Sequence, residues 1–325
     1  MQISVIGCGR WGSLIAWYLD RIGHEITLYG RSGSKHFQAF KETRGNGLLT
    51  LSEKVALTSD LELACRAEII LISVPSQHLR RLMEEMRPLD LQNRVFVLCM
   101  KGIETESGKR LSEIAEETTH PSNRVAVWLG PGHVQEFLAG IPNCMVIDSR
   151  YDDVKARLVT MFSSELIRFY YGEDLIGNEV GAASKNVIGI AAGILDGLKM
   201  TTLKGALMSR GTREIAKLIE AMGGNPFSAY GLCHLGDYEA TVFSQYSHNR
   251  RFGECFALGK PYDELAEGYS TAAAMQVLSK RYGVELPICT AVYRILYEGV
   301  SPSEEIDLLF RRTLKREWDA ETVRK

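Results

Sequence analysis

The stretch GCGRWG at residues 7–12 decides the fold of this 325-residue chain. It follows an apolar run at residues 1–6, which favours a buried strand, and precedes an apolar pattern at residues 13–19, which favours a helix packed on a sheet. In that position, its three glycines are typical of a dinucleotide site, because they permit a tight turn, a close approach to pyrophosphate and close helix packing. An ordinary glycine-rich loop explains this placement less well.

The composition is that of a soluble globular protein large enough for two domains. The chain is 45% apolar and 24% charged, with a formal net charge of −2, which argues against a general nucleic-acid or membrane-surface binder. No apolar run reaches the length of a membrane span, and the chain begins directly with a core strand. We therefore expect no signal peptide and a cytoplasmic protein. Seven scattered cysteines without a C-x-x-C pair favour reduced thiols over disulfides or a metal site.

The first half of the chain alternates strand-like and helix-like segments. Helical patterns at residues 77–86 and 107–118 lie between the apolar runs. Such runs, separated by helices, predict a mostly parallel sheet covered on both faces. The expected strands are residues 1–6, 24–29, 68–74, 94–100, 124–129 and 143–147.

The pattern changes near Gly177, after which few strands are expected. We predict an α/β Rossmann-type domain at residues 1–178 and an all-α domain for substrate binding and catalysis at residues 179–325. The active site is then expected in the cleft between the two. The helical patterns of the second half cover residues 180–195, 203–222, 272–282, 289–298 and 303–314.

The end of the second expected strand indicates which nucleotide binds. An NAD site usually has an acidic residue there, whereas this chain reads Leu28-Tyr29-Gly30-Arg31. Arg31 is available to pair with a 2′-phosphate, so we predict NADP as the preferred cofactor, with NAD as the alternative. The pattern is also compatible with Arg31 as a solvated surface residue.

Two lysines stand where a reductase needs a proton donor. Lys101 directly follows an expected strand, so it lies at the carboxyl edge of the sheet, where such folds bind ligands. Lys185 lies in a helix of small and apolar residues, where a charge is costly unless it is paired or functional. A lysine that snorkels to solvent remains an alternative. Asp237 offers a carboxylate to pair with a buried lysine, and residues 247–253 collect groups that could hold a phosphate or form a simple basic loop.

Taken in order, these motifs resemble those of the soluble NAD(P)-dependent glycerol-3-phosphate dehydrogenases over nearly the whole chain. The matching strings are GCGRWG at 7–12, VPS at 74–76, KGIE at 101–104, GP at 130–131, KNVI at 185–188, LGD at 235–237, NRRFG at 249–253 and EGY at 267–269.

The resemblance implies roles for individual residues. Lys185 matches the catalytic acid/base, Lys101 the lysine that contacts both substrate and nicotinamide, and Asp237 the carboxylate of the same network. Besides these three, the implied substrate contacts are Gly130, Asn186, Thr241, Ser247, His248, Asn249 and Arg250. The implied cofactor contacts are Gly7, Gly9, Arg10, Trp11, Gly12, Arg31, Lys101, Val134 and Glu267.

The resemblance also implies a reaction. NAD(P)H passes a hydride to C2 of dihydroxyacetone phosphate, and Lys185 protonates the alkoxide to give sn-glycerol 3-phosphate for glycerophospholipid synthesis. Family members are commonly homodimers, so the expected partners are a small phosphorylated substrate and a second copy of the chain.

The chain departs from the family pattern where substrate and cofactor are expected to meet. His248 replaces a phosphate-binding arginine, and Leu129 and Gly132 replace residues with hydroxyl groups. Two alternatives therefore stay open. One is a paralogous reductase of another small phosphorylated or phosphonylated carbonyl compound, and the other is a non-catalytic dinucleotide-binding sensor.

Overall fold

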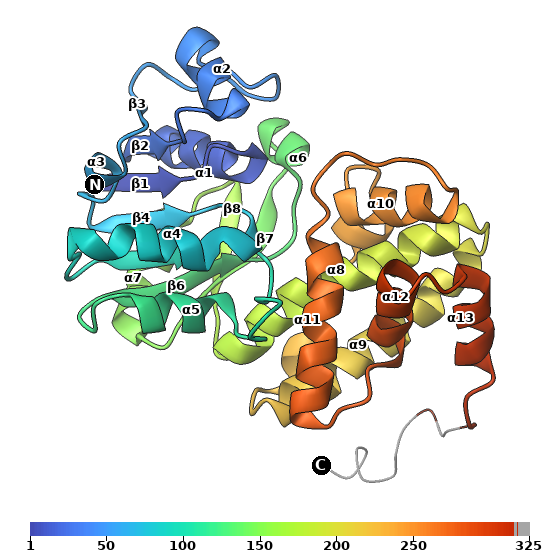
Figure 1. Ribbon diagram of the computed structural model, residues 1–325. Coiled ribbons are helices and arrows are strands. Elements are labelled where there is room, and N and C mark those ends of the chain that lie inside the picture. Colours follow the sequence, from blue (N-terminus) through green and yellow to red (C-terminus); the bar gives the residue numbers. More distant parts are fainter. Residues whose placement is uncertain (315–316, 318–325) are drawn as a thin grey trace.

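The computed structural model describes residues 1–314 and residue 317. Figure 1 shows a sheet flanked by helices in the first half of the chain and a bundle of helices in the second half. The strands are β1 Gln2–Ile6, β2 Glu25–Tyr29, β3 Ala56–Thr58, β4 Ile69–Ile72, β5 Val95–Leu98, β6 Arg124–Leu129, β7 Asn143–Ser149 and β8 Ile167–Tyr171. The helices of the first half are α1 Arg10–Arg21, α2 Lys35–Thr43, α3 Leu61–Ala64, α4 Leu79–Met86, α5 Leu111–Thr118, α6 Val134–Leu138 and α7 Asp152–Phe162. Those of the second half are α8 Leu175–Gly197, α9 Lys204–Ala221, α10 His248–Ala257, α11 Glu267–Tyr282, α12 Pro287–Tyr297 and α13 Pro302–Phe310.

The described strands form one sheet in the order β3-β2-β1-β4-β5-β6-β7-β8. All neighbours pair in parallel except β6 and β7, where Val127 lies opposite Asp148 in an antiparallel pair. The predicted mostly parallel sheet is therefore confirmed. Because β1, β4, β5 and β6 run in the same direction, the loops that follow them gather at one edge of the sheet.

Two of the observed strands, β3 and β8, were not predicted from the sequence. Strand β3 has only three residues, too few for a periodic signal. Strand β8 alternates, with Ile167 and Phe169 buried and Arg168 and Tyr170 exposed, which is the pattern of a half-buried strand near an edge. The last predicted helix, residues 303–314, is shorter in the structure and ends at Phe310.

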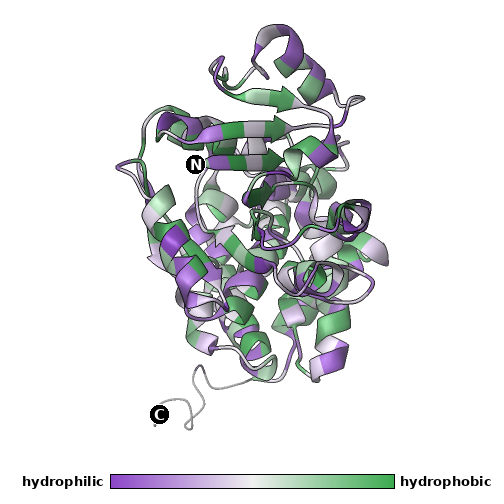
Figure 2. Ribbon diagram, turned by 90° about the vertical axis from the view of Figure 1, so that its left-hand side faces the viewer, coloured by the Kyte–Doolittle hydropathy of each residue, from purple (hydrophilic) through white to green (hydrophobic). Residues whose placement is uncertain are grey.

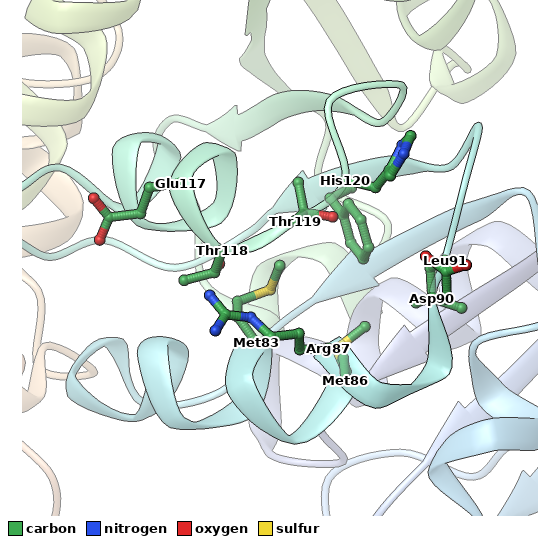
Figure 3. Close-up of a pocket in the computed structure, with 10 residues that line it drawn as sticks. Met83, Met86, Arg87, Asp90, Leu91, Glu117, Thr118, Thr119 and His120 are labelled. Atoms are coloured by element: carbon green, nitrogen blue, oxygen red, sulfur yellow. The ribbon is translucent and has the colours of Figure 1, made fainter.

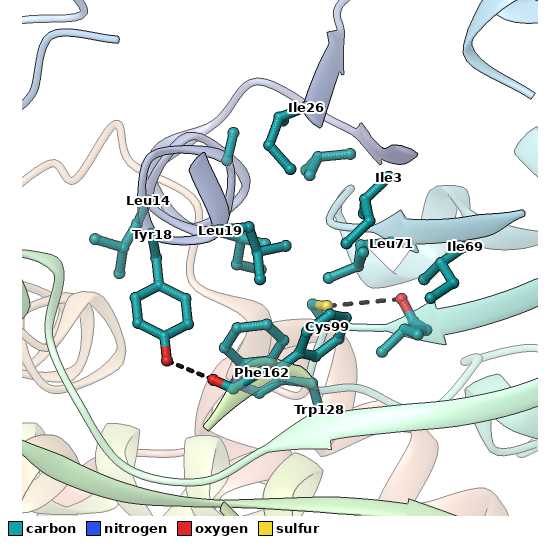
Figure 4. Close-up of a cluster of buried hydrophobic side chains, with 14 of the residues drawn as sticks. Ile3, Leu14, Tyr18, Leu19, Ile26, Ile69, Leu71, Cys99, Trp128 and Phe162 are labelled. Atoms are coloured by element: carbon teal, nitrogen blue, oxygen red, sulfur yellow. Dashed lines mark hydrogen bonds between the residues drawn. The ribbon is translucent and has the colours of Figure 1, made fainter. Parts of the chain in front are cut away.

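The core on one face of the sheet is built from large apolar and aromatic side chains of α1, α7 and the central strands (Figure 4). Trp128 of β6 packs against Phe162, with ring centroids 5.6 Å apart, and against Tyr18 at 6.1 Å. The Tyr18 hydroxyl donates a hydrogen bond of 2.5 Å to the Phe162 carbonyl, so burying this polar tip leaves no donor unsatisfied.

Helix α8 is the central helix of the second half. Nearly all of its middle is buried, and it packs against α9, α10, α11 and α12. Helix α10 approaches it closely because both helices carry glycine at the crossing: a Cβ on Gly193 would lie 1.8 Å from the Arg250 carbonyl oxygen, and one on Gly253 would lie 2.1 Å from that of Ile190. In Figure 2 the hydrophilic residues of the helices alternate with hydrophobic ones, as expected for helices with one buried face.

The two halves are joined by a buried ion pair. Arg110, just before α5, donates to Glu179 of α8 over 2.7 Å, and both side chains are 4% exposed. Ser112 completes the contact through its amide and hydroxyl groups, so the carboxylate is fully hydrogen-bonded. The predicted domain boundary at residue 178 falls at the end of the first turn of α8 and stays a prediction. Among the described helices, none combines the length and the hydrophobicity required to span a lipid bilayer.

Candidate active site

The glycine-rich loop after β1 is packed tightly on one side and open on the other. Gly7 has a φ of +112°, and a Cβ there would lie 2.1 Å from the Ser73 carbonyl oxygen. A Cβ on Gly12 would lie 1.9 Å from the Gly7 carbonyl oxygen, whereas one on Gly9 would meet no heavy atom within 4 Å. The first turn of α1 carries no acidic residue. The loop thus leaves space and free N–H groups for an anion, which fits a dinucleotide pyrophosphate.

A cluster of two lysines and one carboxylate lies where the halves of the chain meet. Oδ2 of Asp237 accepts from Nζ of Lys101 over 2.6 Å and from Nζ of Lys185 over 2.8 Å. Lys185 also donates to the Thr241 hydroxyl over 2.7 Å, and Lys101 to the Gly130 carbonyl over 2.6 Å. The structure therefore brings together the three predicted catalytic residues and two of the predicted substrate contacts.

Each member of this cluster is held by a different element. Lys101 follows β5 at the carboxyl edge of the sheet, and Lys185 projects from the middle of α8. Asp237 ends the 3₁₀ turn Leu235–Asp237, and Thr241 lies in the π-helical turn Glu239–Phe243 that follows. Such irregular turns are frequent at functional sites, because they place side chains where a regular helix cannot.

The environment of the cluster prepares Lys185 to give up a proton. The Lys185 side chain is 9% exposed and that of Asp237 is 1% exposed, against 22% for Lys101. The pKa of Lys185 is lowered to about 8: burial lowers it most, Asp237 opposes this, and the Lys101 charge lowers it further. The second carboxylate oxygen of Asp237, Oδ1, is buried without a partner in the described structure. The ammonium of Lys185 is thus poised near neutral pH to act as a general acid.

Two asparagines connect α8 to the start of α10. Nδ2 of Asn249 donates to Oδ1 of Asn186 over 3.0 Å, and the Gly268 amide donates to Oδ1 of Asn249 over 2.9 Å. Ser247 caps α10 by accepting from the Arg250 amide. These contacts hold the N-terminal turn of α10 beside Lys185.

His248 makes a contact that spans the two halves. Its Nε2 lies 2.9 Å from Nη1 of Arg10, and its Nδ1 lies 2.7 Å from the Tyr262 hydroxyl. A guanidinium has only donors, so Nε2 is the acceptor and the proton of a neutral imidazole lies on Nδ1. Burial lowers the pKa of His248, and the Arg10 charge lowers it further.

The remaining predicted site residues lie in varied surroundings. Glu267 of α11 accepts from the Ser76 amide over 3.0 Å and from its hydroxyl over 2.5 Å, so this residue of the helical half reaches the loop after β4. Arg31 is exposed at the end of β2. The Trp11 ring centroid lies 6.1 Å from that of Phe137 in α6. Val134, the first residue of α6, is also buried.

The charge of Arg250 is already compensated by carboxylates of the protein. Arg250 donates to Asp196 over 2.6 Å and to Glu254 over 3.2 Å, so two carboxylates compensate its guanidinium. Its predicted role as a substrate ligand stays a prediction, one that this geometry does not favour.

Two residues beside the site were not singled out as site residues from the sequence. Tyr262 gave no signal, because it lies in an irregular loop between α10 and α11 without a motif around it. His133 follows Gly132 in the loop after β6, and its buried Nε2 has no partner among the described residues. Burial lowers the pKa of His133, while Lys185 and Asp237 lie near enough to influence it in opposite directions. The departure of this loop from the family pattern was the one signal that pointed to it.

A pocket of about 230 Å³ lies elsewhere, between the ends of α4 and α5 (Figure 3). It is lined by residues that precede β5 and β6, including Leu91 and His120, so it lies at the amino edge of the sheet. Ligands of this fold bind at the carboxyl edge, which places the pocket outside the candidate site.

A Rossmann-type sheet, an open anion loop and a buried Lys–Asp–Lys cluster together define a two-domain dinucleotide-dependent dehydrogenase. The family described as NAD-dependent glycerol-3-phosphate dehydrogenase matches this chain with its N-terminal part at residues 2–155 and its C-terminal part at residues 174–307. The chain belongs to this family.

Similar proteins agree with that assignment. The glycerol-3-phosphate dehydrogenase [NAD(P)+] of Thermoanaerobacter sp. (strain X514) is 38% identical over 98% of this chain and 99% of its own. That of Chlorobium limicola is 36% identical over 98% and 99%. The crystal structure of glycerol-3-phosphate dehydrogenase from Coxiella burnetii superposes with a TM-score of 0.89 at 28% identity, covering 96% of this chain and 99% of that one.

Proposed function

We propose that this protein reduces dihydroxyacetone phosphate to sn-glycerol 3-phosphate with NAD(P)H. The observation that carries the proposal is the buried contact of Lys185 and Lys101 with one carboxylate oxygen of Asp237, at 2.8 and 2.6 Å. Family membership and the names of the similar proteins support the same reaction.

The side chains of the cluster have distinct roles in this reaction. The bound NAD(P)H supplies a hydride to C2 of the ketone. Lys185 donates a proton from Nζ to the oxygen that becomes the alcohol, and its electron pair stays on the nitrogen. Lys101 stabilises the negative charge that develops on this oxygen. Asp237 holds both ammonium groups in place and, by its charge, keeps Lys185 protonated.

The residues of the sheet edge hold the cofactor. Gly7 and Gly9 leave room for the pyrophosphate at the N-terminus of α1. Arg31 pairs with a 2′-phosphate, so we propose a preference for NADPH over NADH. Val134 and Glu267 border the nicotinamide end, where Glu267 joins α11 to the loop after β4.

Loss of absorbance at 340 nm tests the reaction. We expect the purified protein to oxidise NADPH on addition of dihydroxyacetone phosphate, and NADH more slowly. Rapid turnover with NADH alone would keep the reaction and refute the role of Arg31. Cofactor binding without turnover of this substrate would refute the proposed reaction.

The cellular setting is part of the proposal. We propose a cytoplasmic homodimer whose product supplies the glycerophospholipid backbone. A nucleotide-binding domain at residues 1–178 and a catalytic domain at residues 179–325 complete this description. Light scattering of the purified protein measures the dimer directly, and a mass of one chain would contradict it.

A second candidate is a reductase of another small phosphorylated or phosphonylated carbonyl compound. His248 and Gly132, which depart from the family pattern, favour this candidate. Higher kcat/KM for another carbonyl compound than for dihydroxyacetone phosphate would identify it. A non-catalytic sensor is less favoured, because cofactor binding alone needs no buried proton donor.

A further inference from the structure

Arg10 begins α1 in the first half of the chain, yet its guanidinium lies against α10 of the second half. Its Nη1 donates to Nε2 of His248 over 2.9 Å, and His248 in turn contacts the Tyr262 hydroxyl over 2.7 Å. Arg10, His248 and Tyr262 are therefore linked by two successive hydrogen bonds, the first of which crosses the boundary between the halves. We call it the Arg10 bridge.

The guanidinium of Arg10 carries the one positive charge of the Arg10 bridge, and neither His248 nor Tyr262 supplies a negative charge to balance it. No carboxylate forms an ion pair with Arg10 in the part of the chain that the structure describes. The nearby Arg250 is different, because Asp196 and Glu254 compensate it. His248 cannot compensate Arg10, because an imidazole that accepts from a guanidinium is neutral. A half-buried guanidinium with one occupied donor keeps further N–H groups for an anion.

The position of this charge relates it to the lysine cluster. His248 is followed by Asn249, which contacts Asn186, and Asn186 is followed by Lys185. Ser247 caps the N-terminal turn of α10 by accepting from the Arg250 amide, and this helix end favours negative charge. Arg10 is therefore hydrogen-bonded to the first residue of α10, and the second residue of that helix is hydrogen-bonded to the residue next to Lys185.

We propose that Arg10, held in place by His248, is the cation that binds the phosphate group of the substrate. The nucleotide half of the chain thus supplies the charge, and the helical half positions it. Substrate phosphate then contacts both halves at once, so its binding favours their closed arrangement. This inference rests on the proposed function for the identity of the substrate, but not for the phosphate chemistry.

A charge exchange tests the proposal. We expect Arg10→Ser to raise the KM for dihydroxyacetone phosphate about ten- to a hundredfold, because one charged hydrogen-bonded contact is lost. The reaction with dihydroxyacetone, which lacks the phosphate, should hardly change. The double variant Arg10→Ser/His248→Arg, which moves the guanidinium onto α10, should regain most of the loss. Arg251→Ser is the matched control, since Arg251 lies over the same Tyr262 ring at 5.7 Å.

The cofactor is the competing source of phosphate. If Arg10→Ser raises the Kd for NADPH by a similar factor and leaves the KM for dihydroxyacetone phosphate unchanged, Arg10 is a cofactor ligand and the proposal is wrong. A KM that rises equally for dihydroxyacetone is a general structural effect and also contradicts it.

A binding measurement separates this proposal from the proposed reaction. Calorimetry with inorganic phosphate, on the NADPH-loaded protein, needs no turnover. Tighter phosphate binding by the unmodified protein than by Arg10→Ser supports the Arg10 bridge even if dihydroxyacetone phosphate is not reduced. Equal binding by both proteins overturns it. Thermal unfolding of each variant shows that it is folded.

Discussion

The lysine cluster and the Arg10 bridge differ in how they handle charge. In the cluster, one carboxylate oxygen of Asp237 contacts both Lys101 and Lys185, so the cations are held by an anion of the protein itself. In the bridge, Arg10 is held by neutral partners, His248 and then Tyr262. The first arrangement stabilises proton-transfer groups before a ligand arrives, whereas the second leaves charge to be satisfied by a ligand.

Under the proposal that Arg10 binds the substrate phosphate, this difference accounts for a departure from the family pattern at His248 and none at Asp237. The cluster depends on its one carboxylate, because removing Asp237 leaves both Lys101 and Lys185 without the anion that they share. The bridge has no such dependence. Under the same proposal, Arg10 of α1 supplies the charge that the family pattern places on α10.

The largest effect is expected from removing the proton donor. Lys185→Ala should lower kcat about a thousandfold, because general acid catalysis is lost, while NADPH still binds. Steady-state kinetics and a cofactor titration measure the two properties. Lys155→Met is the control for the loss of a buried charge, because Lys155 is a buried lysine of α7 that makes no contact with the cluster. Retained turnover in Lys185→Ala would exclude it as the acid.

Asp237→Asn should break the compensation within the cluster and lower kcat about a hundredfold. Burial and the Lys101 charge lower the pKa of Lys185, Asp237 opposes them, and the net result is a pKa of about 8. Reduction needs protonated Lys185, so its rate should fall as the pH rises through about 8 in the unmodified protein. Without the carboxylate, this limb should move to lower pH. A pH–rate profile with an unmoved limb would contradict the assignment.

A smaller effect is expected in the loop that borders the cluster. Gly132 has a φ of +135°, and a Cβ there would lie 2.4 Å from the Phe137 ring. Gly132→Ala should lower the Tm by about 5 °C through strain and displacement of the ring. Gly140→Ala has a positive φ of +78° but meets no atom within 4 Å, so it measures the strain alone. Equal Tm values for the two variants would show that the contact with Phe137 is unimportant.

The smallest effect is expected at Arg31, the exposed arginine that follows β2. Arg31→Ala should reduce the ratio of kcat/KM for NADPH over NADH about fivefold, because an exposed charge pair is worth little in water. Arg66→Ala, another exposed arginine, is the control. An unchanged ratio means that other groups choose the cofactor.

Much of the fold was predictable because strong local patterns produced it. The glycine loop, the apolar strands and the long helix around Lys185 all carry a periodic or positional signal. Strand β3 carries too few residues for one, and the antiparallel pairing of β6 with β7 depends on contacts that no local pattern contains.

For the site, the sequence by itself determined the nucleotide fold and provided the lysines and the carboxylate, through motifs whose spacing is set by the backbone. Only the tertiary structure decided how these groups meet. It placed Arg10 against His248, which lie far apart in the chain, and paired Arg250 with Asp196 rather than leaving it free. The physical reason is that hydrogen bonds and ion pairs act over a few ångströms in space, so the availability of a charge depends on its folded neighbours.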